Sequence, residues 1–348
     1  MREGYIEVLE RVTSAIEPSK DDLIYLLETK DTKEYTILSQ AACDIRDIYC
    51  GKRMAIRGLV EFSSFCKNTC KYCGLNRYNK TASRYRLNPD EIIKLADHVY
   101  TAGFHTIVLQ SGEDGYPAQE IAKIITSIKV KFNIAITLSV GERSFEDYQL
   151  WKEAGADRYL LRIETKDRLL YKSLHQGRNV ETRLQALKDL QSLGYQTGSG
   201  IMIGSPGQTI EHIANDILFL TKEAFDMIGI GPFIPHEKTP FARYPKGPVQ
   251  LTLNTLALLR ICTKNTWIPA TTALGSLERD YRLDALMAGA NVVMPNFSPE
   301  SIKKKYEIYP NKSCVKEKEE SVHMLCKNLA SKAGLEIDYA RCDSLKVT

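Results

Sequence analysis

The chain has 348 residues, of which 43% are hydrophobic, and its 47 Lys and Arg against 43 Asp and Glu give a formal net charge of +4. This small charge gives no reason to expect binding to nucleic acid or to an anionic membrane. No apolar stretch approaches the roughly 20 residues of a membrane span, and the charged residues 1–7 lack the apolar region of a signal peptide. The nine cysteines are an odd number, so we expect reduced thiols in a cytoplasmic protein and not a disulfide framework.

The N-terminal part of the chain reads as helical. Helices are expected over residues 5–16, 20–28 and 34–49, and the whole segment 1–52 would form an N-terminal helical extension.

From residue 53 onward, short β-rich runs alternate with longer amphipathic segments. The runs expected to be strands are 54–62, 106–110, 134–140, 158–162, 198–203, 227–235, 268–274 and 291–295. The amphipathic segments expected to be helices include 89–102, 119–131, 181–193 and 210–224. Several strands are almost continuously apolar, as strands buried on both faces are. Eight such units predict an α/β fold, a closed (β/α)8 TIM barrel over residues 53–310; an open doubly wound sheet is the alternative.

The residues after the barrel form a third segment, 311–348. It begins rich in Lys and Glu, is expected to be helical over 321–333, and ends in a tail packed on the barrel.

Three cysteines follow the first strand in a single short run, Cys66, Cys70 and Cys73. A four-iron cube normally takes four cysteines, so the spacing C-x3-C-x2-C leaves one iron open to a chelating ligand. A zinc site would close with four ligands, and the polar residues between the cysteines argue against simple core packing. The spacing, with Tyr72 and Gly74 around the last cysteine, is typical of the radical S-adenosylmethionine (SAM) enzymes, which bind SAM at the open iron and cleave it reductively.

Polar residues cluster where the expected strands end, which is where active sites of α/β barrels gather. After the second strand come Ser111, Gly112 and Glu113, a segment that resembles the one binding the amino group of SAM in radical SAM enzymes. Near the end of the fourth strand lie Arg162 and Glu164, which share one face of an extended strand. Glu164 could bind the ribose hydroxyls and Arg162 an anionic substrate group; the alternative is a structural ion pair.

Two further positions are candidates for cofactor binding. Arg183, near the start of an expected helix, could reach the SAM carboxylate through bidentate hydrogen bonds, or could be a solvated surface charge. Glycines flank the fifth strand up to Gly204, and they would let a flat adenine ring lie against the backbone.

Seven runs of residues resemble the FeFe-hydrogenase maturase family HydE, which is related to biotin synthase and methylornithine synthase. They are 108–114, 153–161, 162–165, 206–209, 225–236, 269–273 and 289–296. The resemblance implies a SAM-chelated 4Fe–4S cluster above an internal cavity. It implies a small-molecule substrate, an iron carbonyl–cyanide–cysteine complex supplied by another maturase and used to build the hydrogenase H-cluster. A low-potential electron donor is a further implied partner. By position, the residues implied to line the cavity are Ser111, Arg162, Met227, Thr271, Thr272, Met294, Tyr306 and Tyr309.

One departure from the family concerns a second cluster. Some members carry it on a C-terminal C-x7-C-x2-C motif; here Cys314 remains, but Val322 and Leu325 occupy the other two positions and Cys326 is displaced. Two cysteines are insufficient for a cube, so we predict a single cluster.

Two other functions stay open. A carbon-skeleton mutase of the methylornithine synthase type would also hold a small amino acid with Arg162 and the threonines. A cluster carrier without catalysis would use the same three cysteines but would leave Glu164 and Arg183 without a role.

Overall fold

The computed structural model describes residues 1–315 and 321–346. Six parallel strands form one continuous sheet whose spatial order follows the chain. They are β2 (Gly58–Ser63), β3 (Thr106–Ser111), β4 (Ala135–Ser139), β5 (Arg158–Leu160), β6 (Gln196–Ile203) and β7 (Met227–Pro232). Nearly every residue of these strands is buried, as their apolar composition predicts.

The sheet closes on itself through shorter elements. Isolated parallel bridges join residues 267–270 to β7 on one side and to β8 (Val292–Val293) on the other. Strand β8 pairs in parallel with β1 (Arg53–Ile56), and the chain runs from β1 directly into β2. The ring of pairings confirms the predicted α/β barrel, although its seventh position makes only single bridges.

Three predicted strands end earlier than expected, 158–162 at Leu160, 227–235 at Pro232 and 291–295 at Val293, and two others differ more. The strand expected over 268–274 is wrong beyond Ala270, because the amide of Leu274 bonds back to the carbonyl of Thr271 and a short helix, α11 (Thr272–Gly275), begins. The single strand expected over 54–62 is divided at Arg57 into β1 and β2. At Gly58 an added Cβ would lie 2.6 Å from a Val99 methyl, so a helix approaches the backbone at this division more closely than any side chain permits.

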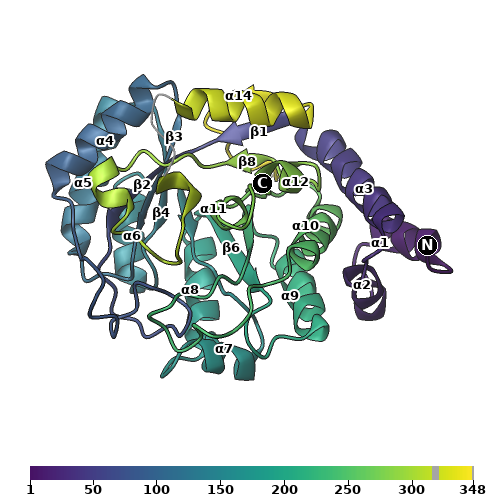
Figure 1. The fold of residues 1–348 in the computed structure, drawn as a ribbon. Helices are drawn as coiled ribbons and strands as arrows, with labels where there is room; N and C mark the ends of the chain where they lie inside the picture. The colour runs from purple at the N-terminus through teal and green to yellow at the C-terminus, as the bar shows by residue number, and fades with distance from the viewer. Residues whose placement is uncertain (316–320, 347–348) are drawn as a thin grey trace.

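Helices connect the strands and cover the outside of the barrel (Figure 1). They are α4 (Pro89–Thr101), α5 (Ala118–Lys131), α6 (Phe145–Glu153), α7 (Arg168–Leu174), α8 (Val180–Ser192), α9 (Ile210–Lys222), α10 (Val249–Thr263), α12 (Arg282–Leu286) and α13 (Glu300–Lys303). The start of α4 shows how sequence determines such boundaries: Asn88 accepts from the amide of Glu91, and Glu91 accepts from the amide of Asn88. None of the described helices is long and apolar enough to cross a membrane.

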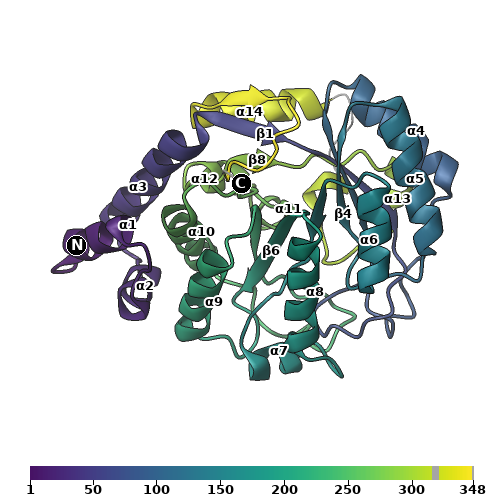
Figure 2. The ribbon, with the colours of Figure 1, turned by 180° about the vertical axis from the view of Figure 1, so that it is seen from behind.

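The N-terminal helices lie to one side of the barrel, against its last large helices (Figure 2). They are α1 (Tyr5–Ser14), α2 (Lys20–Leu27) and α3 (Thr32–Cys50). The buried Asn254 of α10 donates to the carbonyls of Leu27 and Thr29, which attaches the end of α2 to the barrel.

The C-terminal segment closes the barrel at the end where the strands begin, which we call the base. Its first element, a 3-10 turn (Ser313–Val315), still packs against α11 and α13; α14 (Val322–Ala333) and β9 (Glu336–Asp338), which pairs with β1, follow it. After β9 the tail crosses the strand starts: Thr106 donates to the carbonyl of Arg341, and Arg158 pairs with Asp343 at 2.7 Å. Most of the Lys/Glu-rich tract, residues 316–320, and residues 347–348 lie outside the described part of the chain.

Candidate active site

The cysteines lie on a long loop between β2 and α4 at the opposite end of the barrel, the mouth. Backbone hydrogen bonds attach this loop to three neighbours. The amide of Lys67 donates to the carbonyl of Glu113 at 3.0 Å, that of Lys71 to Leu174 at 3.0 Å, and that of Gly74 to Ile308 at 2.9 Å. The loops after β3 and α13 and the last residue of α7 therefore hold the cysteine run in place.

The three thiols fit a four-iron cluster. Burial raises the pKa of the Cys70 thiol to about 12, and the adjacent Cys66 raises it further; burial likewise raises the pKa of Cys73, reinforced by Cys70 and Cys66. The three thiols therefore lie close enough for the charge of one thiolate to affect the pKa of another. Within the described residues no three Cys, His, Asp or Glu side chains converge as they would on a single metal ion. The cysteines of a cube each bind a different iron, so they need proximity but not convergence.

His175 contacts one of these cysteines. Its Nδ1 lies 3.2 Å from the sulfur of Cys70, and the two residues form an antiparallel bridge. The ring of Tyr72 meets the His175 ring edge-on, with centroids 5.5 Å apart. Tyr72, a predicted cofactor-binding residue, thus packs against the residue that follows α7. His175 was not predicted, because nothing in its spacing links it to the cysteines.

Two arginines and two glutamates form a buried network beside the cysteines. Arg178 lies 2.7 Å from Glu113 and also contacts Glu142; Arg183 lies 2.5 Å from Glu142 and 3.8 Å from Glu113. Burial alone would raise the pKa of Glu113, but Arg183 and Arg178 outweigh it and hold that pKa below its ordinary value. The side chain of Arg183 is only 9% exposed, so the alternative that it is a solvated surface charge is wrong.

The segment Ser111–Glu113 meets the cysteine loop directly. The hydroxyl of Ser111 donates to the carbonyl of Gly112 at 2.6 Å. A Cβ at Gly112 would lie 2.2 Å from the carbonyl oxygen of Phe65, so only glycine allows this approach. The sequence pattern therefore marks a close contact between two loops of the mouth.

Arg162 and Glu164 form the predicted pair, with Nη2 and Oε2 2.9 Å apart, but not for the predicted reason. Strand β5 ends at Leu160, so the two side chains do not share a face of an extended strand. Glu164 instead has a φ of 63°, a left-handed conformation, and its amide donates to the carbonyl of Gly200 at 2.9 Å. Arg162 also donates to the carbonyl of Ile201 at 2.7 Å. Strained backbone of this kind concentrates at functional sites.

Gly204 has a structural reason to be glycine. Its φ is 77°, and an added Cβ would lie 2.4 Å from the Cα of Gly247. The close contact with Gly247 is enough to require glycine here, whether or not an adenine ring binds against it. Its role in cofactor binding stays a prediction.

Two of the predicted substrate residues lie around a buried ion pair near the cysteines. Lys312 and Glu61 are 2.6 Å apart, with 3% and 2% of their side chains exposed. The ammonium of Lys312 also lies 4.8 Å from the ring centre of Tyr306. It donates a hydrogen bond to the Tyr306 carbonyl at 2.8 Å. Burial, followed by the charge of Glu61, raises the pKa of Tyr306. Tyr309 is half-buried, and its pKa is raised, first by burial and then by the nearby Cys314 and Glu61.

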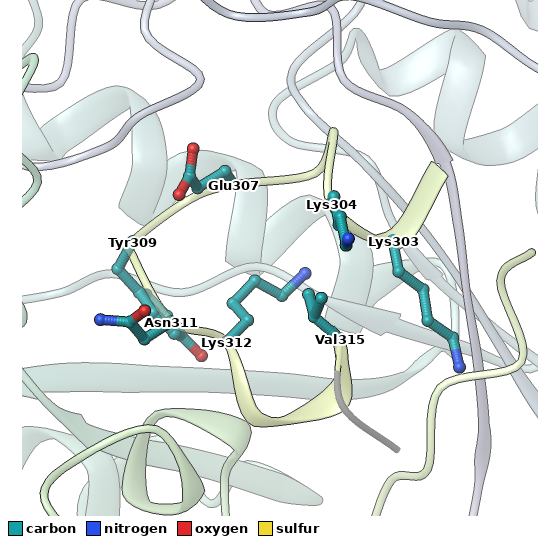
Figure 3. Close-up of a pocket in the computed structure, with 7 residues that line it drawn as sticks. All are labelled: Lys303, Lys304, Glu307, Tyr309, Asn311, Lys312 and Val315. Atoms are coloured by element: carbon teal, nitrogen blue, oxygen red, sulfur yellow. The ribbon is translucent and has the colours of Figure 1, made fainter. Parts of the chain in front are cut away.

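A pocket of about 250 Å³ opens beside this ion pair. Figure 3 shows the side chains of Lys304 and Lys312 reaching into it from two parts of one loop. The residues that line it are Lys303, Lys304, Glu307, Tyr309, Asn311, Lys312 and Val315.

The remaining substrate residues divide between two depths of the barrel. Met227 and Met294 pack with Trp267 in a small apolar cluster toward the base. Arg57, which was not predicted, lies there too: it is 1% exposed, its Nη1 is 3.0 Å from the sulfur of Met227, and its Nε and Nη2 have no hydrogen-bond partner.

The two threonines lie where the chain leaves the seventh position of the ring and enters α11. The hydroxyl of Thr271 donates to the carbonyl of Ile230 at 2.9 Å, and Thr272 is the first residue of α11. The structure therefore brings Arg162, Tyr306 and Tyr309 toward the mouth and Met227 and Met294 toward the base.

Known proteins share this fold. The family model of the radical SAM superfamily matches residues 60–220. The crystal structure of methylornithine synthase superposes with a TM-score of 0.83 at 26% identity, covering 95% of this chain and 97% of that one. The FeFe-hydrogenase maturase HydG from Carboxydothermus hydrogenoformans gives 0.80 at 20% identity, covering 99% and 80%, and shares the fold. The chain is therefore a radical SAM enzyme, which excludes a cluster carrier without catalysis.

Relatives identified by sequence show to which family within this superfamily the chain belongs. The FeFe-hydrogenase maturase subunit HydE of Thermotoga maritima is 46% identical over 314 residues, 90% of each chain. The 3-methylornithine synthase of Methanosarcina acetivorans is 30% identical over 287 residues, covering 82% of this chain and 81% of that one. The chain belongs to the HydE family of radical SAM enzymes, as the sequence motifs indicated.

Proposed function

We propose that this enzyme processes an iron carbonyl–cyanide–cysteine precursor in assembly of the FeFe-hydrogenase H-cluster. The observation that carries the proposal is the 46% identity to HydE over 90% of both chains. The buried guanidinium group of Arg57 and the partly exposed one of Arg162 support it, because a cyanide-bearing carboxylate complex is anionic and these groups offer positive charge to it.

In this proposal Cys66, Cys70 and Cys73 hold one 4Fe–4S cluster, which supplies the reducing electron for SAM cleavage when bound. The residues proposed to hold SAM around it are Tyr72, Ser111, Gly112, Glu113, Glu164, Arg183 and Gly204. Glu142 and Glu113 orient the guanidinium of Arg183, so that little rotamer freedom remains to be lost when a carboxylate binds. The left-handed turn at Glu164 positions its carboxylate beside Arg162.

The substrate is proposed to occupy the barrel interior between the two depths. Arg162 would bind an anionic group of the substrate, with Thr271 and Thr272 offering hydroxyls. Met227, Met294, Tyr306 and Tyr309 would supply apolar walls and exclude water, which protects a radical from side reactions. Residues 53–310 would form the catalytic barrel, with 1–52 and 311–348 as its extensions.

A carbon-skeleton mutase is the second candidate, because 3-methylornithine synthase is 30% identical and shares the fold at a TM-score of 0.83. One anaerobic experiment separates the two. The reconstituted enzyme is given SAM and dithionite, with the iron–cysteine complex, with lysine or with neither, and 5′-deoxyadenosine is measured. Cleavage stimulated by the complex, with adenosyl attached to its sulfur, supports the maturase. Cleavage stimulated only by lysine, with a rearranged product, supports the mutase and contradicts the maturase.

We also propose that the chain carries a single cluster. Cys314 lies in the turn Ser313–Val315, whereas Cys326 is fully buried in α14, within the hydrophobic core. The test is an iron and sulfide count after reconstitution. Wild type should hold about four irons, and the triple variant Cys66→Ala, Cys70→Ala, Cys73→Ala should hold none. Four irons retained by the triple variant would show a second site.

A further inference from the structure

We propose that the outer face of the cysteine loop is the docking surface for a small acidic electron-carrier protein. We call residues 62–89 the basic loop, because they contain six Lys or Arg and no Asp or Glu. The six are Lys67, Lys71, Arg77, Lys80, Arg84 and Arg86. The whole chain is nearly balanced at +4, so this excess is local.

Several of these charges face solvent. Arg77 and Lys80 are exposed, and 60% of the Lys67 side chain is exposed although it lies 3.5 Å from Glu113. Arg86 pairs with Asp114 at 2.5 Å and still exposes 42% of its side chain. Arg84 differs, because it donates to carbonyls of its own loop and so shapes it. The exposed members present positive charge that a partner can reach.

The basic loop also exposes two aromatic rings beside its arginines. Phe65 is 41% exposed and Tyr78 63% exposed. The guanidinium of Arg86 lies 5.0 Å from the Phe65 ring centre, and that of Arg77 lies 5.6 Å from the Tyr78 ring centre. Aromatic residues and arginine are the types enriched at protein–protein interfaces and among residues that dominate binding energy.

Further lysines flank the basic loop across a pocket of about 280 Å³. Gly74 and Asn79 line one wall of this pocket, and Lys238, Lys304 and Lys305 line others. Two acids share the rim: Glu237 lies 3.1 Å from Lys238, and Glu307 lies 3.7 Å from the imidazole of His236. The flanking surface therefore adds positive charge, only part of which is balanced.

The position of the loop identifies the kind of partner. Radical SAM cleavage consumes one electron, and that electron must arrive at the cluster held by the three cysteines, which belong to the basic loop itself. The residues proposed for SAM and substrate occupy the barrel side, which leaves the outer face for the donor. Electron-transfer complexes have small, transient interfaces, and opposite charge raises their rate of encounter.

The step transfers one electron and no atom. The reduced carrier, for example a flavodoxin hydroquinone, is oxidised by one electron to its semiquinone, and the cluster-loaded enzyme is reduced by one. The inference depends on the enzyme class and not on which substrate the barrel holds.

The test compares two reductants on matched variants. Arg77→Glu with Lys80→Glu reverses two exposed charges of the basic loop; Lys123→Glu with Lys188→Glu makes the same change in net charge on α5 and α8. We measure 5′-deoxyadenosine formation by the reconstituted enzyme with reduced acidic flavodoxin and, separately, with dithionite. The basic-loop variant should lose about tenfold in rate with flavodoxin at low ionic strength and keep its rate with dithionite. The control should keep both.

Salt and a milder variant complete the test. The wild-type rate with flavodoxin should fall as ionic strength rises, and that of the basic-loop variant should respond much less. If the variant also slows with dithionite, the milder variant Arg77→Gln with Lys80→Gln is measured in its place. The proposal then requires that its rate with flavodoxin fall more than its rate with dithionite. An unchanged flavodoxin rate, or an equal loss in the α5 and α8 control, would overturn the proposal. So would variants that slow only the transfer of substrate from another maturase, since the surface would then belong to that partner.

Discussion

Ion pairs occur at both ends of the barrel, but the carboxylates that pair at the mouth are more deeply buried than Asp343, which pairs with Arg158 at the base. At the mouth the side chains of Glu61 and Glu113 are 2% and 3% exposed, whereas at the base that of Asp343 is 46% exposed. A buried ion pair is costly to break, because removing one partner leaves an uncompensated charge, while an exposed pair contributes little. Breaking the Lys312–Glu61 pair at the mouth should therefore cost more stability than breaking the Arg158–Asp343 pair at the base.

The difference follows from what each end must do. The mouth must hold the three thiols at fixed positions relative to Arg162, Glu164 and Arg183. Its loops therefore need contacts that permit only one conformation. The base encloses the apolar cluster around Met227 and Trp267, together with the buried guanidinium of Arg57. Variants that disturb one end and spare the other test this contrast.

The largest effect is expected from the cysteines of the mouth. Replacing Cys66, Cys70 or Cys73 by Ala should abolish reductive SAM cleavage, because each thiolate would hold one iron of the cluster. The free energy of unfolding should change by no more than about 1 kcal/mol, since the loop keeps its backbone hydrogen bonds. Product analysis and urea unfolding measure the two quantities. Cys262→Ala in α10 is the control and should keep its activity; cleavage retained by any of the three variants would contradict the assignment.

The buried pair of the mouth should show the next largest effect. Lys312→Met leaves Glu61 buried without its partner, and we expect a loss of about 3–5 kcal/mol in unfolding free energy. Lys246→Met removes a similar contact at 2.8 Å from the exposed Glu278 and should cost less than about 1 kcal/mol. Chemical denaturation measures both.

A rescue variant isolates the cause. Glu61→Gln combined with Lys312→Met should recover part of the lost stability, because no charge is then left unpaired. Equal losses for Lys312→Met and Lys246→Met would remove the distinction between buried and exposed charge on which the comparison depends.

Asp216 of α9 tests the mouth through pH. Its carboxylate accepts from the amide of Lys166 at 2.6 Å, next to the turn that carries Glu164. Burial raises the pKa of Asp216 to about 7, so between the unfolded pKa near 4 and pH 7 the folded state binds one more proton than the unfolded state. Stability from this residue is therefore greatest in acid and should fall by about 1 kcal/mol per pH unit up to neutrality.

The measurement is urea unfolding at pH 5.5 and pH 8. Asp216→Asn should lower the pH dependence relative to wild type, whereas Asp97→Asn, on the exposed side of α4, should leave it unchanged. If Asp216→Asn and wild type show the same pH dependence, the carboxylate is ionised throughout and the mouth tolerates an uncompensated charge.

The sequence predicted those features of the candidate site that depend on residues close together in the chain. The cysteine spacing, the strand-end segment Ser111–Glu113 and the pair Arg162 and Glu164 were all found in this way. The same reasoning failed at residues 271–274, where two threonines followed by the helix formers Ala273 and Leu274 enter a short helix, closed by a hydrogen bond from Leu274 to Thr271. It also assumed an extended strand through Glu164, where the chain makes a left-handed turn.

Contacts between distant segments could not be predicted. Glu61 and Lys312 are 251 positions apart, and the partners of Glu113 and Cys70, Arg178 and His175, come from the loop after α7. One signal was available for Arg57 and Glu61: a charged residue inside a run expected to be a buried strand needs a partner or a ligand. Searching for such residues would have found both.

The smallest effect is expected at the base. Asp343 lies 2.7 Å from Arg158, and its pKa is lowered: burial would raise it, but Gln196, Arg158 and Arg341 together outweigh burial. Asp343→Asn should cost at most about 1 kcal/mol near neutral pH, because the carboxylate is half-exposed and water screens the pair. A lowered pKa in the folded state stabilises above the unfolded pKa and is lost as pH falls through the folded one. Wild type and variant should therefore converge in stability below about pH 4. SAM cleavage should be unchanged, since no contact of Asp343 reaches the cysteine loop; a loss of cleavage would show that the base, too, positions the reaction.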